Sequence, residues 1–209
     1  LSGGVGSRLW PLSRKSHPKQ YLPLFQEKSL FELTIQRNRP IADKLMVIGN
    51  RDNDHLSQEV LDKLDVNYLK IVEAVPRNTA AAIAFAALAV DENDILIVTP
   101  SDHLIEDMEA YQDAMKRAID LAKNDFIVTF GVQPTRPETG YGYIEHKGDK
   151  VISFREKPNH ITAQDFIEQG NFLWNSGMFC FKAKVLLKEL KKLLKSISNS
   201  HEIEFLSGY

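Results

Sequence analysis

The sequence is poor in cysteine, in long apolar runs and in excess charge, and each shortage excludes a class of protein. Cys180 is the single cysteine, so a disulfide within the chain is excluded. No apolar run approaches the roughly 20 residues that a membrane-spanning helix needs, and the alanine-rich stretch 80–90 is too short. With 26 Lys+Arg and 28 Asp+Glu the net charge is −2, which gives no electrostatic reason for a nucleic-acid or acidic-membrane partner.

What the sequence does contain is enough apolar material for a folded core. Hydrophobic residues make up 43% of the 209 residues, and this length suits one large domain, which we expect over residues 1–209. No signal peptide is visible, so a cytoplasmic location is the simplest prediction. The chain opens on a loop and residues 196–209 lack periodicity, so we expect the domain to be truncated at both ends.

Short apolar runs alternate with segments of helical period through most of the chain. This order predicts an α/β domain with a mostly parallel sheet and helices on both sides. The run at 94–99 shows no polar alternation, which is typical of a strand buried on both faces. Strands are predicted at 45–49, 67–72, 94–99 and 126–132, and helices at 54–64, 78–90 and 108–123.

The pattern changes in the last third of the chain. Two short strands, 141–146 and 150–155, flank a Lys-Gly-Asp turn and predict a β-hairpin added to the α/β core. A helix is predicted at 162–169, followed by an aromatic strand at 172–181 that an Asn-Ser-Gly turn interrupts. A Leu/Lys helix with an ordinary solvated face is predicted at 183–195.

The opening loop from Ser2 to Arg8, Ser-Gly-Gly-Val-Gly-Ser-Arg, is the strongest local signal. Its glycines allow several backbone N–H groups to approach one anion, and Arg8 adds a planar charged group that matches phosphate oxygens. The spacing is neither the dinucleotide Gly-x-Gly-x-x-Gly motif nor the P-loop, which ends on Gly-Lys-Ser/Thr. Because Lys19 extends the basic cluster soon afterwards, we predict a triphosphate cradle.

Polar residues follow the predicted strands, where ligands of open α/β sheets bind. Asp102 comes just after the strand at 94–99 and is placed to hold Mg²⁺, which prefers oxygen ligands and bridges substrate phosphates. Glu73 ends another strand, shortly before Asn78 and Thr79 at the start of a helix, and its carboxylate suits the N–H donors of guanine. Capping and turn roles remain the alternatives for these residues.

A third group of polar residues lies in the last part of the chain. Glu156 and Lys157 follow the second hairpin strand, and Asn175 lies in the aromatic strand. A carboxylate and an amide at strand ends suit vicinal sugar hydroxyls, and Lys157 suits a sugar phosphate. An ordinary turn is the alternative for the Asn-Ser-Gly sequence.

Six ordered blocks of the sequence closely resemble the mannose-1-phosphate guanylyltransferases. They are Leu1-Ser-Gly-Gly-Val-Gly-Ser-Arg-Leu-Trp-Pro-Leu-Ser-Arg14 with Pro18-Lys-Gln20, Arg77-Asn-Thr-Ala80, Pro100-Ser-Asp-His103, Gly140-Tyr-Gly-Tyr-Ile144, Phe154-Arg-Glu-Lys-Pro158 and Trp174-Asn-Ser-Gly-Met-Phe179. The first two are similar to the bacterial branch that is often fused to a mannose-6-phosphate isomerase domain.

The resemblance implies the nucleotide-diphospho-sugar transferase fold, a Rossmann-like α/β/α sandwich with a mixed, mostly parallel sheet and an added β-hairpin. It implies transfer of GMP from GTP to α-D-mannose 1-phosphate, giving GDP-mannose and pyrophosphate, with Mg²⁺ as cofactor. Arg8, Lys19 and Asp102 are then catalytic, and Asp102 binds the metal. The implied nucleotide-binding residues are Ser2, Gly3, Gly4, Gly6, Ser7, Arg8, Lys19, Glu73, Asn78, Thr79, Ser101 and Asp102, and the implied sugar-phosphate residues are Gly140, Glu156, Lys157 and Asn175.

The sequence also departs from the family pattern. Ala74 and Pro76 stand where the family usually has Pro and Gly, and Ala82 replaces a frequent Pro. The family carries a second metal-binding Asp in an Asp-x-Gly-x-Trp block, and no such block occurs in the 209 residues. The open alternatives are a nucleotidyltransferase for another sugar 1-phosphate, a bifunctional parent protein with a fused isomerase domain, and a non-catalytic sugar-nucleotide sensor; a homo-oligomer is also open.

Overall fold

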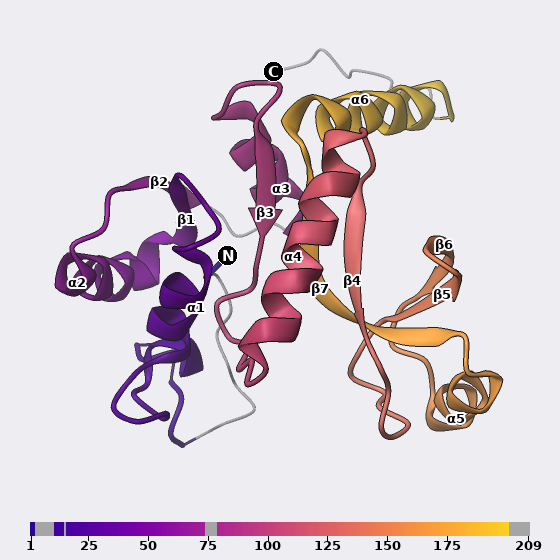
Figure 1. Cartoon of the computed structure of the whole chain (residues 1–209), viewed down its shortest axis with the longest axis horizontal. Coiled ribbons are helices and arrows are strands. Elements are labelled where there is room, and N and C mark those ends of the chain that lie inside the picture. Colours follow the sequence, from indigo (N-terminus) through magenta and orange to yellow (C-terminus); the bar gives the residue numbers. More distant parts are fainter. Residues whose placement is uncertain (3–10, 15, 74–78, 201–209) are drawn as a thin grey trace, which may run out of the picture. The chain divides into compact units, whose positions relative to one another are not determined.

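The computed structural model describes residues 1–2, 11–14, 16–73 and 79–200. The chain divides into two compact units, with Leu1–Ile127 and Cys180–Tyr209 in unit 1 and Val128–Phe179 in unit 2. Their helices and strands are labelled in Figure 1. One domain over residues 1–209 stays a prediction.

A parallel pair of strands forms the first sheet of unit 1. β1 (Leu45–Asn50) and β2 (Tyr68–Glu73) pair along their whole length, with Asn50 opposite Glu73 at their carboxyl ends. Successive side chains of a strand point to opposite faces of the sheet. The strand sequence therefore supplies apolar side chains to two separate layers of helices.

Helices cover both faces of this sheet, which gives the α/β/α layering. On one face, α1 (Leu30–Asn38) and α2 (Asp54–Leu64) form a core with β1. On the other face α3 (Thr79–Leu88) packs through its alanines. The first core contains Phe31, Ile35, Val47 and Leu61, and the second contains Ile48, Ala82 and Ala86.

Helix α1 has no counterpart among the helices predicted from the sequence. The Ser29 hydroxyl accepts a hydrogen bond from the backbone N–H of Glu32 at 3.1 Å and so caps the helix. A Ser followed three residues later by a Glu is the signature of a capping box. The signal was therefore present in the sequence, and the prediction missed it.

The rest of unit 1 contains β3 (Ile95–Val98), α4 (Met108–Lys123) and α6 (Ala183–Ser200). α6 lies alongside α3 (Figure 1). β3 is half-buried except at Val98, so the prediction of a strand buried on both faces was wrong. The reason is its position at the end of the strand order β3-β7-β5-β6. None of the helices in the described ranges is long and apolar enough to span a bilayer.

Unit 2 consists of strands packed against one helix. It contains β4 (Val128–Val132), β5 (Tyr143–Lys147), β6 (Lys150–Arg155), α5 (His160–Gln169) and most of β7 (Phe172–Lys182). β5 pairs antiparallel with both β6 and β7, and β4 also pairs with β7. The core between α5 and the strands is aromatic, and the rings of Phe166 and Phe172 stack at 4.0 Å.

The predicted hairpin and the α/β class with a mixed sheet are confirmed. β5 and β6 form the hairpin, whose turn contains Gly148 with a φ of 59°. β7, by contrast, is continuous through Asn175, so the predicted interruption of the aromatic strand was wrong. Gly177 has a left-handed backbone conformation within the strand, with a φ of 71°. Glycine adopts this conformation readily because it has no Cβ to clash.

Cys180 in β7 provides a test of this packing. Its side chain is fully buried, and burial raises the pKa of the thiol to about 11. At pH 8 only about one thiol in a thousand is then ionised, and that thiol is also inaccessible. We expect a thiol-specific chromogenic reagent to leave the native chain unmodified at pH 8 and to modify one thiol per chain in guanidinium. Rapid reaction of the native chain would show that β7 is not packed as described.

Candidate functional site

The first two residues lie between the carboxyl ends of β1 and β3. The Ser2 N–H donates to the Ile48 carbonyl at 2.9 Å, and the Ser101 N–H donates to the Leu1 carbonyl at 3.0 Å. Both serines are almost fully buried. The opening loop therefore starts at the edge of the sheet where α/β proteins bind ligands. The predicted residues Gly3, Gly4, Gly6, Ser7 and Arg8 lie outside the described residues.

Lys19 and Asp102 form an ion pair at this edge. Lys19 Nζ lies 2.7 Å from Asp102 Oδ2, and each side chain is about one-third exposed. The neighbouring Gln20 is buried, and its Nε2 donates to the Ser2 carbonyl at 3.0 Å. We call this group the Asp102 cluster; it consists of Ser2, Lys19, Gln20, Ser101 and Asp102.

His103 lies beside this cluster. Its Nε2 is 3.8 Å from Asp102 Oδ1. Burial lowers the pKa of His103, the charges of Arg37 and Lys19 lower it further, and the Asp102 carboxylate opposes the shift. The ring is therefore expected to be neutral near pH 7, so it does not compete with a cation for Asp102 by its own charge.

The predicted base-binding residues are described only in part. Glu73 is half-buried at the carboxyl end of β2, and Thr79 is the first residue of α3. Asn78 occupies the position before that helix and lies outside the described residues. Among the described contacts, neither Glu73 nor Thr79 forms an ion pair or hydrogen bond with Lys19 or Asp102, so their role near a base stays a prediction.

In unit 2, the predicted sugar residues meet around Gly142. The Asn175 N–H donates to the Gly142 carbonyl at 2.8 Å. A Cβ added to Gly142 would lie 2.6 Å from the Phe154 ring and 3.3 Å from Glu156 Oε2, so both side chains lie against this glycine and a larger residue would require the Phe154 ring to shift. Asn175 Oδ1 accepts the Gly177 N–H at 3.1 Å, so the amide oxygen of this side chain is bonded within β7.

Two residues that the sequence analysis missed hold the neighbouring loop. Glu138 Oε1 accepts the Gly140 N–H at 3.0 Å, and the buried Tyr143 hydroxyl bonds to both the N–H and the carbonyl of Glu138 at 3.0 Å. These bonds fix Gly140 near the turn that leads to Gly142. The sequence signal was weak, since Glu138 differs from any solvated glutamate only in its position two residues before Gly140.

Lys157 pairs with Glu156 at the surface of unit 2. Its Nζ lies 2.9 Å from Glu156 Oε1, and both side chains are more than half exposed. The pair contributes little to stability in water. We call Gly140, Gly142, Glu156 and Asn175 the Gly142 cluster, and Lys157 lies at its exposed margin.

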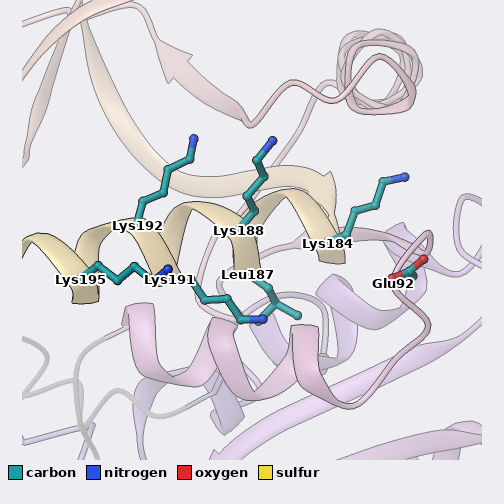
Figure 2. A pocket seen from close by; sticks show the side chains of 7 residues that line it. All are labelled: Glu92, Lys184, Leu187, Lys188, Lys191, Lys192 and Lys195. Carbon is teal, nitrogen blue, oxygen red and sulfur yellow. The ribbon is translucent and has the colours of Figure 1, made fainter.

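A surface hollow of about 390 Å³ in unit 1 is lined by residues that belong to neither cluster. It is open and lies on α6 (Figure 2), where Leu187 points toward the neighbouring helix and Lys188 and Lys192 point away. None of the predicted site residues lines it. The lining residues are Glu92, Lys184, Leu187, Lys188, Lys191, Lys192 and Lys195.

Comparisons with known proteins show which proteins this chain is similar to. The chain is 44% identical over 209 residues to the xanthan biosynthesis protein XanB of Xanthomonas campestris, covering 96% of this chain and 45% of that protein. It is 43% identical over 217 residues to a mannose-1-phosphate guanylyltransferase of Salmonella muenchen, covering 97% of this chain and 46% of that protein. The chain thus spans about half the length of these relatives.

A solved structure shows the same fold. It is titled mannose-6-phosphate isomerase from Helicobacter pylori, and it shares 46% identity and a TM-score of 0.81, over 88% of this chain and 73% of that one. The resemblance to mannose-1-phosphate guanylyltransferases and their fold is therefore confirmed. The family model described as nucleotidyl transferase matches residues 1–205, and the chain belongs to the nucleotidyl transferase family.

Proposed function

We propose that this chain transfers GMP from GTP to α-D-mannose 1-phosphate and releases pyrophosphate. The observation that carries the proposal is the pairing of Lys19 with Asp102 at the sheet edge where the opening loop begins. The cationic side chain suits the phosphates of a nucleoside triphosphate, and the anionic side chain suits a divalent metal ion. The similarity to the Salmonella guanylyltransferase supports guanine and mannose as the substrate groups.

The reaction needs the reactants to be aligned and their negative charge neutralised, and it needs little acid–base catalysis. A phosphate oxygen of the sugar phosphate is already an anionic nucleophile; it forms a bond to the α-phosphorus while the bond from that phosphorus to pyrophosphate breaks. Lys19, together with Arg8 from the opening loop, is proposed to neutralise charge on the triphosphate. The Gly142 cluster is proposed to orient the sugar phosphate through Glu156 and the Asn175 amide nitrogen.

Asp102 fits a divalent metal ion, which we propose to be Mg²⁺. Among the described residues, its Oδ1 forms no hydrogen bond or ion pair closer than the 3.8 Å approach of His103, and the side chain is about one-third exposed. Mg²⁺ commonly binds through one or two carboxylates and the substrate phosphates. Asp102 would hold the ion, which would supply charge stabilisation to the substrate phosphates. The second carboxylate that the family implies is not found in this sequence.

A pyrophosphate-release assay tests the proposal. We expect release with GTP, mannose 1-phosphate and Mg²⁺ together, and much less when ATP, CTP or UTP replaces GTP, or when glucose 1-phosphate replaces the mannose compound. Equal release with every nucleotide would contradict the guanylyl assignment. Binding of GDP-mannose without any release would favour the sensor alternative instead.

We further propose that any isomerase activity of the parent protein resides in a fused domain. The support is the length of the curated relatives, of which this chain covers about half, and the isomerase title of the Helicobacter structure. Assaying the full-length protein and residues 1–209 side by side for mannose 6-phosphate isomerisation tests this. Equal activity in both would contradict it.

A further inference from the structure

Arg37 is a buried cation that the proposed reaction does not use. It lies in α1, is 5% exposed, and its Nη2 donates to Thr34 Oγ1 at 3.2 Å. Its Nε is buried without an acceptor in the described part of the chain, and no carboxylate there forms an ion pair with it. Buried arginines are normally paired with an anion. The position of this one therefore calls for an explanation beyond packing.

The other guanidinium contact reaches the segment that carries Asp102. Arg37 Nη1 donates to the backbone carbonyl of His103 at 3.3 Å. The guanidinium also lies 5.1 Å from the centre of the Tyr111 ring, and the Tyr111 hydroxyl donates to Asn38 Oδ1 at 2.7 Å. The charged group is therefore held between α1 and α4, and it presents one donor to the residue that follows Asp102.

Two contacts thus hold residues 101–103, which we call the Asp102 segment, from opposite ends. On one side the Ser101 N–H donates to the Leu1 carbonyl, and on the other side the His103 carbonyl accepts from Arg37. Asp102 lies between these two anchors, and its partly exposed side chain pairs with Lys19, with His103 Nε2 3.8 Å from its other oxygen. Among the described residues, the Arg37 guanidinium is the one hydrogen-bond donor to the His103 carbonyl.

We propose that Arg37 is a positioning residue that fixes Asp102 through the His103 carbonyl. Its planar group of several donors bonds to Thr34 and His103 at once, which the single ammonium of a lysine does less well. A misplacement of about 1 Å in a reacting group can reduce a rate a hundredfold, so a second anchor on this segment has a large effect. The kinetic consequence rests on the proposed function, whereas the structural consequence does not.

Hydrogen–deuterium exchange tests the anchor without any substrate. In Arg37→Met, the Ser101 amide, which donates to the Leu1 carbonyl, is expected to exchange about tenfold faster or more. Losing the bond from the charged guanidinium to the His103 carbonyl lowers the free energy of opening this segment locally. Arg37→Lys should lie between Arg37→Met and the native chain. Tyr111→Phe is the matched control, since it removes the Asn38 bond and keeps the ring beneath the guanidinium.

Kinetics give the second readout. In Arg37→Met the Mg²⁺ concentration for half-maximal pyrophosphate release should rise about tenfold and kcat should fall. The KM for mannose 1-phosphate should stay within about twofold, because the Gly142 cluster is untouched. If Arg37→Met does not fold, the same exchange and kinetic measurements are made on Arg37→Lys.

Native exchange rates and native Mg²⁺ dependence in a folded Arg37 variant would overturn the proposal. So would a Tyr111→Phe variant that reproduces both effects, because packing alone would then explain them. If the native chain releases no pyrophosphate, the proposed function fails, and the exchange experiment still decides the role of Arg37.

Discussion

Asp102→Asn is expected to lower kcat for pyrophosphate release by about 10²–10³-fold at saturating GTP and Mg²⁺. The substitution keeps the shape of the side chain but removes the charge that would hold the metal ion, whose contribution to charge stabilisation is several kcal/mol. Stability should change by less than about 1 kcal/mol, since the pair with Lys19 is partly exposed. A steady-state assay with a Mg²⁺ titration and a urea melt measure both quantities.

Asp107→Asn is the matched control for this variant. Asp107 lies five residues further along and caps α4 by accepting the Ala110 N–H at 2.9 Å. Asparagine caps helices about as well as aspartate, so both activity and stability should stay near the native values. If Asp102→Asn retains native kcat and native Mg²⁺ dependence, Asp102 does not bind the metal.

The second large effect is expected for Glu156→Gln. The carboxylate lies next to Gly142, where it is proposed to accept hydrogen bonds from two sugar hydroxyls. Replacing a charged acceptor by an amide weakens those bonds by about 1.5–3 kcal/mol, so kcat/KM for mannose 1-phosphate should fall by about 10–150-fold. The KM for GTP should change little. Initial rates measured with each substrate varied in turn separate these two effects.

Glu145→Gln serves as the comparison on the same hairpin. Glu145 lies on β5 and accepts the Ser153 hydroxyl at 2.6 Å, away from Gly142. Its replacement should leave the KM for mannose 1-phosphate unchanged. An equal fall in kcat/KM for both variants would indicate general damage to the hairpin and would remove Glu156 from the sugar site.

The elements with strong periodicity were predictable from the sequence. The helices at 54–64 and 108–123 match α2 and α4 residue for residue, because each carries a continuous apolar face. Burial was less predictable, since an apolar run does not show whether a strand lies at a sheet edge, as β3 does. The continuity of β7 through Gly177 depends on one left-handed glycine, and the same Asn-Ser-Gly sequence is equally typical of a turn.

For the candidate site, the residue types were predictable and their partners were not. The sequence pointed to Lys19 and Asp102 separately, but the 2.7 Å contact between them arises from the fold. Arg37 gave no signal at all, because an arginine on an amphipathic helix is normally solvated. Its burial and its bond to His103 follow from how α1 packs beside the Asp102 segment.

The Lys19–Asp102 contact also bears on the order in which ligands bind. A cation held by Asp102 would lie close to the ammonium group of Lys19, and the repulsion between the two positive charges would oppose binding of the bare ion. A triphosphate would add negative charge beside both cations and so offset this repulsion. The two ligands are therefore thermodynamically linked, and by reciprocity each should raise the affinity of the site for the other.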